Sequence, residues 1–354
     1  MLCYGSTVVS CTATQPAFRK TPHLPCGLDG MREIVPDPAA LFTALRRVAI
    51  ELPGDAPAVT WTALAADIAR EDDVLAIVHR RSDARELLDA VDAAVGHRET
   101  VHLSALQCPA HRSALLDDVQ RRKAAGQPVR VVSTQLVEAG VDLDFATVFR
   151  ALAGFDALAQ AAGRCNREGR RALGAVRVFR APTQPPPGVL RSGLDVAMNL
   201  LRELPDLDVL APDAQRRYFE RLYKNVGAEK DAKGIQELRA RLLFASVAEA
   251  FTMIEDDWSA PVVVPFGDGA TLLDRLRHGG PDSADRRTLR KLQRFTVSVP
   301  RRAHDELLRR GHLERVAEAV TAVPAHRRSA YDPRVGLDLS FLADGAADIG
   351  ALVV

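Results

Sequence analysis

The stretch from residue 59 to residue 182 alternates short apolar runs with amphipathic segments, and this alternation limits the possible folds more than any other feature. Val74–His79 and Val129–Ser133 have the length and the β-branched content of buried strands. Ser82–Val95 instead carries its apolar residues on one helical face. Strands that alternate with helices favour an α/β fold with a parallel, doubly wound sheet. Ligands of such sheets bind at the carboxyl ends of the strands.

The other segments of this stretch have the same two patterns. We expect further helices at Trp61–Arg70, His111–Ala125 and Asp156–Cys165, and further strands at Val101–Leu103, Ala146–Arg150 and Val176–Phe179. Before this stretch, a short helix is expected at 39–50 and a buried strand around Val8 and Val9. A lone parallel strand needs neighbours, so the Val8–Val9 strand suggests that the chain is the later part of a larger protein.

The part after residue 182 has a different organisation. Pro182–Gly188 is rich in proline and predicts a linker. Helices are expected at Leu190–Leu204 and Asp213–Val226. Further on, the pattern predicts a strand at 261–265, a helix at 270–277 and a strand at 295–299, which together make a small α+β domain.

Composition excludes several classes of function. The formal net charge is +1, so any track that binds nucleic acid must be local. The five cysteines form no Cys-x-x-Cys pair, and their odd number is typical of a protein of the reducing cytoplasm. No run approaches the ~18 apolar residues of a membrane span, and the first residues lack the basic region of a signal peptide. We therefore expect a cytoplasmic protein without a membrane partner.

Residues 160–171 are candidates for a phosphate-binding segment. Arg164 and Arg167 are three residues apart, so on a helix they would share a face. Arginine stays charged and forks onto phosphate oxygens, as the stabilisation of a transferred γ-phosphate requires. Gln160 lies one turn before Arg164, and Gly163 allows a ligand close to the backbone. A solvated basic face is the alternative interpretation of such a run.

Residues 131–145 predict a second binding segment. Two valines precede Ser133 and Thr134, which places both hydroxyls at the carboxyl end of a strand, where they suit contacts with a nucleic-acid backbone. The chain then turns through Gly140, and Asp142 could accept a hydrogen bond from a ribose hydroxyl. A loop with a capping aspartate is the alternative interpretation.

The two segments resemble motifs V and VI of superfamily 2 nucleic-acid helicases. Their sequences are similar to those motifs in the CRISPR-associated helicase–nuclease of type I systems. "VVSTQLVEAGVDLDF" and "QAAGRCNREGR" carry this resemblance. "TVVSCTATQP" is similar to motif III of that family, "VLAIVHRRSDA" to motif IV and "LSALQCPAHR" to the motif after it. "YFERLYKNVG", "RKLQRFTVSVP" and "YDPRVGLDL" are similar to its linker and accessory domain. The resemblance covers nearly the whole chain.

The resemblance implies a RecA-like second helicase lobe, a helical linker and a small α+β C-terminal domain. It divides the chain into the tail of a first RecA-like lobe at 1–20, the second lobe at 21–182, linker helices at 183–240 and the accessory domain at 241–354. No metal site is expected, because His304-Asp305 has no other clustered ligands near it in sequence. His102 and His111 flank Cys108, but that segment matches a helicase motif.

Members of the resembled family hydrolyse ATP with Mg²⁺, move along single-stranded DNA, are recruited by an RNA-guided surveillance complex, and degrade DNA with an N-terminal HD nuclease. Carried over by position, the residues have four expected roles. Arg164 and Arg167 would reach the γ-phosphate. The nucleotide would lie near Gln160, Gly163, Gly140 and Asp142, the DNA backbone near Ser133 and Thr134, and the coupling between lobes would use Thr12 and Thr14.

The sequence departs from this family because it has no Gly-x-x-x-x-Gly-Lys-Ser/Thr phosphate loop and no Asp-Glu-x-His box. The resemblance also does not include the HD nuclease. We therefore expect the C-terminal portion of such a helicase, with ATP and Mg²⁺ bound only when an N-terminal helicase/nuclease half completes the site. A remnant that folds and binds DNA or a partner without ATPase activity is the alternative. A lobe of another superfamily 2 helicase is a third interpretation.

Overall fold

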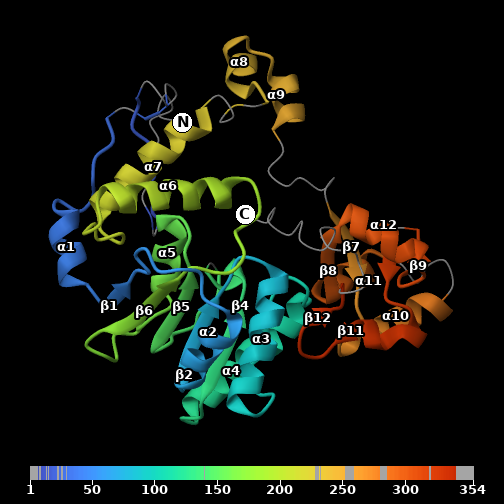
Figure 1. Cartoon of the computed structure of the whole chain (residues 1–354). Coiled ribbons are helices and arrows are strands. Elements are labelled where there is room, and N and C mark those ends of the chain that lie inside the picture. The colour runs from blue at the N-terminus through green and yellow to red at the C-terminus, as the bar shows by residue number, and fades with distance from the viewer. Residues whose placement is uncertain are drawn as a thin grey trace. The chain divides into compact units, whose positions relative to one another are not determined.

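The computed structural model describes residues 7, 9–12, 14, 16–21, 24, 27–28, 30–138, 140–227, 231, 233–251, 259–279, 285–318 and 320–339 (Figure 1). The chain forms two compact units, each made of several stretches of sequence. The first unit comprises Met1–Ala56, Asp144–Phe179 and Pro187–Phe251. The second comprises Pro57–Leu143, Arg180–Pro186 and Thr252–Val354. The expected boundaries near residues 20, 182 and 240 stay predictions.

A six-stranded sheet with the order β1-β6-β5-β2-β4-β3 forms the α/β part of the protein. Its strands are β1 (Val48–Glu51), β2 (Asp73–Ile77), β3 (Val101–Leu103), β4 (Val129–Ser133), β5 (Thr147–Ala151) and β6 (Gly174–Phe179). The pairs β1–β6, β5–β6, β2–β4 and β3–β4 are all parallel. Helices connect these strands, so the fold is the expected RecA-like, doubly wound α/β fold.

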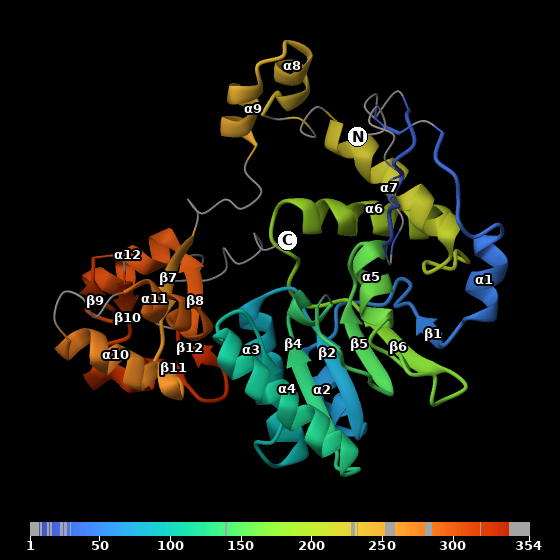
Figure 2. The ribbon, with the colours of Figure 1, turned by 180° about the vertical axis from the view of Figure 1, so that it is seen from behind.

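In the second unit, the helices α2 (Trp61–Ala69), α3 (Arg81–Val95) and α4 (Pro109–Ala124) accompany β2, β3 and β4. β2 and β4 are almost wholly buried, which explains their continuous apolar sequence. Ala84, Leu87, Leu88 and Val91 form the buried stripe of α3 at the spacing expected for an amphipathic helix. Both α3 and α4 contact β3 and β4. Figure 2 shows α3 and α4 beside β4. The expected strands and helices of this unit are confirmed to within two residues.

The first unit holds β1, β5 and β6 with the helices α1 (Pro38–Ala44), α5 (Phe155–Ala162), α6 (Val189–Glu203), α7 (Pro212–Val226), α8 (Ile235–Ala240) and α9 (Phe244–Ala250). α6 packs against α7, and α7 packs against α5. Tyr218 of α7 is buried and its ring stacks on Phe155 with centroids 5.3 Å apart. Burial and the neighbouring Asp156 raise the pKa of the Tyr218 hydroxyl well above its ordinary value.

Three expectations in the first unit are wrong. The helix expected at 39–50 ends at Ala44, because Val48–Glu51 pairs with β6 as β1. The helix expected at Asp156–Cys165 ends at Ala162, because the backbone turns over the next four residues. Val9 belongs to no strand and is 66% exposed, so it is not part of a buried strand, while Val8 lies outside the described residues.

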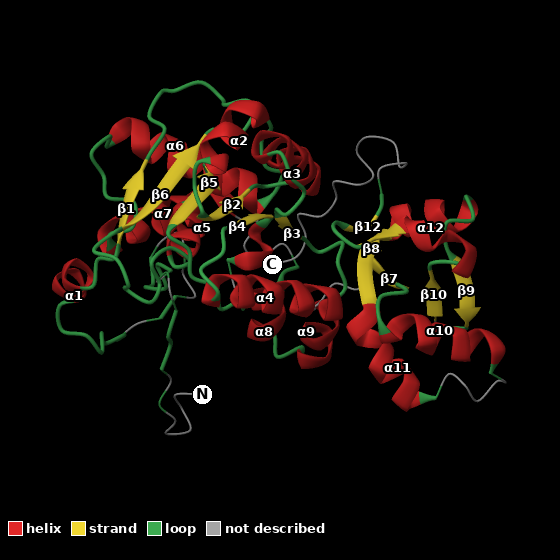
Figure 3. Cartoon of the chain, turned by 90° about the horizontal axis from the view of Figure 1, so that it is seen from below, coloured by secondary structure: helices red, strands yellow, loops and turns green. Residues whose placement is uncertain are grey.

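The accessory domain belongs to the second unit and confirms the expected α+β class. Its sheet has the order β8-β7-β10-β9. The elements are β7 (Ser259–Val263), α10 (Asp268–His278), α11 (Arg286–Leu292), β8 (Thr296–Pro300), α12 (Arg301–Arg309), β9 (Glu314–Ala317) and β10 (Val320–Ala322). Figure 3 shows the helices α10, α11 and α12 around this sheet. The expected strands at 261–265 and 295–299 and the helix at 270–277 correspond to β7, β8 and α10.

A short hairpin near the end of the described chain packs against the loop between β3 and α4, within the same unit. The hairpin consists of β11 (Tyr331–Asp332) and β12 (Gly336–Leu337). The Tyr331 hydroxyl accepts a hydrogen bond from the Cys108 backbone N–H at 3.1 Å and lies 2.9 Å from Nδ1 of His111. The Leu337 N–H donates to the Leu106 carbonyl at 2.8 Å. The structure thus joins the sequence segments 103–112 and 331–339.

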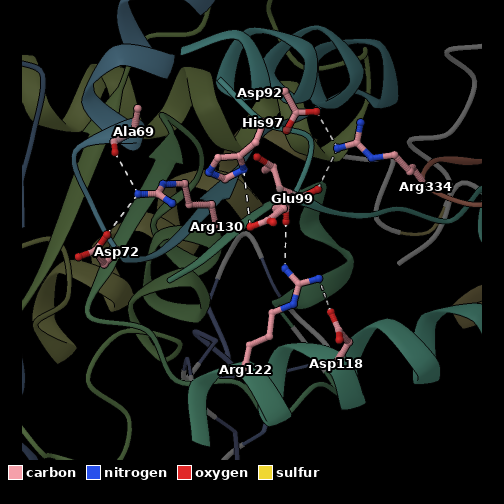
Figure 4. Close-up of polar contacts among 10 residues, drawn as sticks. Ala69, Asp72, Asp92, His97, Glu99, Asp118, Arg122, Arg130 and Arg334 are labelled. Carbon is pink, nitrogen blue, oxygen red and sulfur yellow. Dashed lines mark hydrogen bonds and ion pairs between the residues drawn. The ribbon is translucent and has the colours of Figure 1, made fainter. Parts of the chain in front are cut away.

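An ion pair holds the turn of this hairpin (Figure 4). Arg334 Nη2 donates to the Asp92 carboxylate at 2.7 Å and to the Thr100 carbonyl at 3.2 Å. The Asp92 side chain is only 8% exposed. Because a buried carboxylate without a partner is costly, Arg334 makes the hairpin a fixed part of the unit.

Among the described helices, none is long and apolar enough to cross a membrane.

Candidate nucleotide and nucleic-acid site

The carboxyl end of β4 places Ser133 and Thr134 as the sequence predicts. Ser133 is fully buried, and its Oγ lies 2.9 Å from both the Leu103 and the Thr134 carbonyl oxygens. Its hydroxyl therefore ties β4 to β3. Thr134 follows the strand with 8% of its surface exposed, and its N–H donates to the Leu103 carbonyl at 3.3 Å. Thr134 is the better placed of the two to meet a ligand.

Gly140 and Asp142 lie on the surface of the loop that follows β4. Gly140 has φ +71°, a left-handed conformation that side chains with a Cβ rarely adopt. The glycine is therefore needed for the turn. The Asp142 residue is exposed, and its carbonyl accepts a hydrogen bond from Gln120 Nε2 at 3.4 Å. This loop belongs to the second unit, as Ser133 and Thr134 do.

Gln160, Gly163, Arg164 and Arg167 lie in the first unit, at the end of α5. Gln160 is half-buried in the last turn of the helix, and Gly163 is the exposed residue that ends it. Gly163 has φ −65°, so its backbone does not require a glycine. Arg164 is 8% exposed, whereas Arg167 is exposed. The shared helical face expected for the two arginines is wrong, because α5 ends before both of them.

The segment after α5 is a loop held by hydrogen bonds to two other parts of the first unit. The Phe145 N–H donates to the Arg164 carbonyl at 2.9 Å, and the Asn166 N–H donates back to the Phe145 carbonyl at 2.8 Å. Through these two bonds, residues 164–166 run alongside Phe145, which lies just before β5. Cys165 is buried between them, with Sγ 3.4 Å from the Ala146 carbonyl oxygen. The loop is therefore a defined structure and not a solvated basic run.

Asn166 is the organising residue of this loop, and sequence reasoning missed it. It has φ +47°, a left-handed conformation that asparagine tolerates better than most residues. Its Nδ2 donates to the carbonyls of Arg47 and Arg171 at 2.9 and 2.8 Å, and its Oδ1 accepts from the Arg171 N–H at 3.0 Å. The Asn-Arg-Glu-Gly sequence at 166–169 is a turn signal that could have revealed this role.

Arg167 is held at its backbone while its side chain stays exposed. The Asp144 carboxylate accepts a hydrogen bond from the Arg167 N–H at 2.7 Å, and Arg47 Nη1 donates to the Arg167 carbonyl. Asp144 was also missed by the sequence analysis, although it stands two residues after Asp142 in the same motif. A guanidinium on a fixed backbone is suited to bind phosphate oxygens, because the loop loses less conformational entropy on binding.

The remaining predicted residues lie elsewhere. Thr12 is exposed and its hydroxyl donates to the Thr14 carbonyl at 3.1 Å, while Thr14 is buried. His304 Nδ1 lies 3.2 Å from the Asp305 carboxylate on α12. In the described part of the chain, no three His, Cys, Asp or Glu side chains gather in a way that could hold a metal ion.

The parallel sheet, with a buried strand leading into Thr134, has a RecA-like α/β fold, and the loop after α5 carries the candidate residues Arg164 and Arg167. Comparison with known proteins shows which proteins this chain is similar to. Residues 70–170 match the family model for the C-terminal region of the CRISPR-associated nuclease/helicase Cas3. The matched range includes β2, β4, β5 and, in the loop between α5 and β6, the residues Arg164, Asn166 and Arg167.

One curated relative is the CRISPR-associated nuclease/helicase Cas3 of Haloferax volcanii, 28% identical over 251 residues, which are 62% of this chain and 24% of the relative. The crystal structure of T. fusca Cas3 with ATP has a TM-score of 0.52 and 16% identity, and the match covers 79% of this chain and 39% of that one. A structure of a pre-nicking CRISPR RNA-guided surveillance complex has a TM-score of 0.52 and 17% identity over 83% of this chain and 44% of the other.

The chain is similar to the C-terminal half of Cas3, and this likeness supports a helicase-related function in a CRISPR system. It spans about a quarter of the length of the curated relative and about two fifths of the solved chains. The solved structures share less than a quarter of their sequence with it, so they speak to the fold.

Proposed function

We propose that this chain supplies the second motor lobe and the accessory domain of an ATP-dependent DNA translocase in type I CRISPR interference. The observation that carries the proposal is the loop after α5. Asn166 and Asp144 fix its backbone and leave the Arg167 side chain exposed, within the range that matches the Cas3 C-terminal region. A solvated basic segment would have no need for this set of hydrogen bonds to distant parts of the sequence.

Arg164 and Arg167 fit the phosphates of a nucleotide. Both are permanently charged, and the backbone of each is held by hydrogen bonds at the end of α5. In the proposed reaction they stabilise negative charge on the transferred γ-phosphoryl group. ATP with Mg²⁺, when bound, would supply that phosphoryl group together with a cation that offsets its negative charge. The phosphate loop is absent from the 354 residues, so an N-terminal helicase/nuclease half must provide it.

The other predicted residues position the nucleotide and the DNA. In the first unit, Gln160 offers an amide for the nucleotide and Gly163 lies beside it, while Asp142 and Gly140 of the second unit keep the nucleotide-binding role that the family resemblance implies. Thr134 donates its hydroxyl to a backbone phosphate of single-stranded DNA, while Ser133 holds β4 in place through the Leu103 carbonyl. Thr12 and Thr14, joined by a hydrogen bond, couple the two lobes.

The cellular context follows from the same likeness. A similar fold occurs in the RNA-guided surveillance complex described above, so we propose that such a complex recruits this protein to DNA. Cys11, Cys108 and Cys165 are free, as expected for action in the reducing cytoplasm.

The test is ATP turnover in the presence of single-stranded DNA. The chain is assayed without a partner, and then mixed with a first-lobe protein that carries a phosphate loop. We expect no turnover without the partner and DNA-stimulated turnover in the mixture. Arg164→Ala and Arg167→Ala should each lower turnover in the mixture by about a hundredfold or more, since phosphate-binding arginines contribute that much to phosphoryl transfer.

Arg216→Ala is the matched control, because Arg216 is exposed on α7 but paired with Asp213 and Glu220. It should leave turnover within about twofold, as an exposed ion pair contributes little. Turnover by the pure chain would contradict the proposal that the phosphate loop comes from elsewhere. A silent mixture of two folded proteins would favour the alternative, a remnant that binds DNA or a partner without ATPase activity.

A further inference from the structure

One part of the accessory domain, residues 259–339, has an excess of positive charge, whereas residues 241–354 as a whole contain sixteen Lys and Arg against sixteen Asp and Glu. Residues 259–339 contain fifteen Lys and Arg against ten Asp and Glu, whereas the whole chain has a formal net charge of only +1. Local excess charge of this kind, and not the total, decides where a polyanion binds.

The densest group of these charges lies on α11 and the turn after it. Arg286, Arg287, Arg290, Lys291 and Arg294 occupy five of nine consecutive positions, and all five are exposed. Arg286 and Arg290 are four residues apart on the helix, and Arg294 follows four residues later in the 3₁₀ turn Gln293–Phe295. We call Arg286, Arg290 and Arg294 the arginine row. Residues four apart share a face of a helix, so neighbouring charges of the row repel each other.

The apolar side of α11 fixes the direction of the row. Leu292 is 2% exposed and belongs to the core that α11 shares with α10 and the sheet. Phe295, directly after Arg294, also packs into this core. Leu292 and Phe295 thus pack inward, whereas the five cations are exposed. The helix α11 itself lies beside α10 (Figure 3).

In the part of the chain that the structure describes, no carboxylate forms an ion pair with the arginine row. Within the described residues, Arg286, Arg290 and Arg294 take part in no ion pair and no side-chain hydrogen bond. The nearby Asp285 caps the helix, since its carboxylate accepts the Thr288 N–H at 2.7 Å. That hydrogen bond, with smaller help from Arg287 and Lys291, lowers the pKa of Asp285. The Asp285 carboxylate is thus engaged at the start of the helix, and in the described residues it forms no ion pair with the row.

Other arginine-rich helices of the chain are built differently. On α7, Arg216 and Arg217 pair with Asp213, and Arg221 pairs with Glu203 at 2.7 Å. On α12, Glu306 pairs with both Arg309 and Arg310. Spacings of three or four residues make most of these pairs possible, and they are the usual way to stabilise a charged helix. The arginine row of α11 lacks such pairs in the described residues, so its charges are available to bind an anionic ligand.

We propose that the arginine row of α11 binds the phosphate backbone of single-stranded DNA without reading its sequence, an inference that rests on the proposed function for the choice of this polyanion. Guanidinium groups fork onto phosphate oxygens, and a line of them follows a backbone of regularly spaced charges. The row offers no aromatic platform for stacking, so the contact depends on charge and not on base identity.

The test measures binding of the complete chain to a fluorescently labelled oligothymidine by anisotropy, without nucleotide, over a series of salt concentrations. The test variant is Arg286→Gln/Arg290→Gln/Arg294→Gln. We expect its affinity at low salt to fall about tenfold or more. The slope of log K against log salt should shrink by about 2, because each phosphate contact on a single strand contributes about 0.7.

The matched control is Arg216→Gln/Arg217→Gln/Arg221→Gln on α7, which removes the same number of charges from paired positions. It should keep the affinity within about twofold and the slope unchanged. Equal losses in both variants would mean that only net charge matters, and unchanged binding by the test variant, or no binding by the unaltered chain, would mean that the row has no role. Each of these results overturns the inference.

A third variant with lysine at the three positions of the row retains the charges and guards against a folding defect. It should keep the salt slope and lose only part of the affinity, since lysine cannot fork onto phosphate. Thermal unfolding of all variants should match the unaltered chain. Because this assay uses neither ATP nor a first lobe, its failure leaves the ATP-turnover test of the proposed function untouched, and the reverse also holds.

Discussion

At the scale of single residues, Asn166 decides the shape of the loop that presents Arg167. Its left-handed backbone turns the chain after α5, and its amide joins the loop to the carbonyls of Arg47 and Arg171. The two roles are separable, because glycine also adopts φ +47° but has no amide. A comparison of two substitutions can therefore assign a cost to each role.

Asn166→Ala should destabilise the protein by about 2–4 kcal/mol, since it loses the hydrogen bonds of a buried amide and strains the left-handed backbone. Asn166→Gly should cost less, about 1–3 kcal/mol, because only the hydrogen bonds are lost. Urea unfolding measures both. Asn199→Ala, at an exposed position on α6, is the control and should stay within about 0.5 kcal/mol. Equal costs for alanine and glycine would contradict the backbone role.

His102 gives the protein a pH-dependent stability. Burial lowers the pKa of His102 from 6.5 to about 4, with further lowering by Arg85, Arg334 and His111 against a smaller opposing effect of Asp332. The folded state therefore holds the ring neutral, whereas the unfolded chain takes up a proton below pH 6.5. Stability from this group is complete above pH 6.5 and is lost as the pH falls toward 4.

When the pH is lowered from 7 to 5, the protonation of this group should reduce the free energy of unfolding by about 2 kcal/mol. Other groups of the protein also titrate on acidification, so the informative quantity is the difference between variants. Urea unfolding of His102→Leu should show a smaller loss between these pH values than the unaltered chain. His97→Leu changes a histidine at the surface and should leave the loss as it was. An equal loss in His102→Leu would assign the effect to other groups.

At the scale of elements, the hairpin β11–β12 depends on a glycine at its closest approach to the lobe. Gly336 has φ +88°, and a Cβ added there would lie 2.2 Å from the Leu106 carbonyl oxygen. Gly311, in the turn after α12, has a similar φ of +69° but open space where its Cβ would be. The two positions share the backbone requirement and differ in the steric one.

Gly311→Ala should cost about 1–2 kcal/mol, the strain of a left-handed alanine. Gly336→Ala should cost about 3 kcal/mol or more, because the backbone of the hairpin must also move away from the loop between β3 and α4. Urea unfolding compares the two variants directly. If they cost the same, the hairpin does not pack as closely as the structure shows.

Elements differ in how far the sequence predicts them. α3 and β4 follow from periodicity, because burial on one face or on both leaves a regular apolar pattern. β1 was missed because Val48–Glu51 is short and its partner β6 lies more than 120 residues away, so no local signal marks the pairing. β11 and β12 have two residues each and exist through contacts with the Leu106–Cys108 loop. A local sequence pattern does not predict long-range pairing of this kind.

The candidate site shows the same division. Arg164 and Arg167 could be chosen as candidates because arginine chemistry and spacing are local; their site role stays a prediction, and their expected helical placement was wrong. The loop conformation depends on Asn166 and on Asp144, which lies 23 residues before Arg167. The burial of Ser133 likewise depends on β3, whose Leu103 carbonyl it contacts. Residue types were predictable, and the contacts that orient them were not.

At the scale of the whole molecule, one part of the first unit leaves apolar side chains uncovered. No residue of α8 or α9 is buried, and Leu242, Phe244 and Phe251 are 71%, 64% and 56% exposed. Single exposed apolar residues are ordinary, but a group of large ones on one helical hairpin is a surface that binds apolar ligands. Val9, at 66%, adds exposed apolar surface nearer the start of the chain.

The folded chain should therefore increase the fluorescence of a hydrophobic dye such as anilinonaphthalene sulfonate. Leu242→Ser/Phe244→Ser should reduce that signal while the unfolding free energy changes by less than about 1 kcal/mol, because these side chains contribute little to a core. Leu173→Ser, at an isolated site 51% exposed, is the control and should leave the signal unchanged. A folded chain that binds no dye, or a double variant that unfolds, would mean that the α8–α9 side chains are packed. Dye lost from the unaltered chain when a first-lobe protein is added would show that assembly covers this surface.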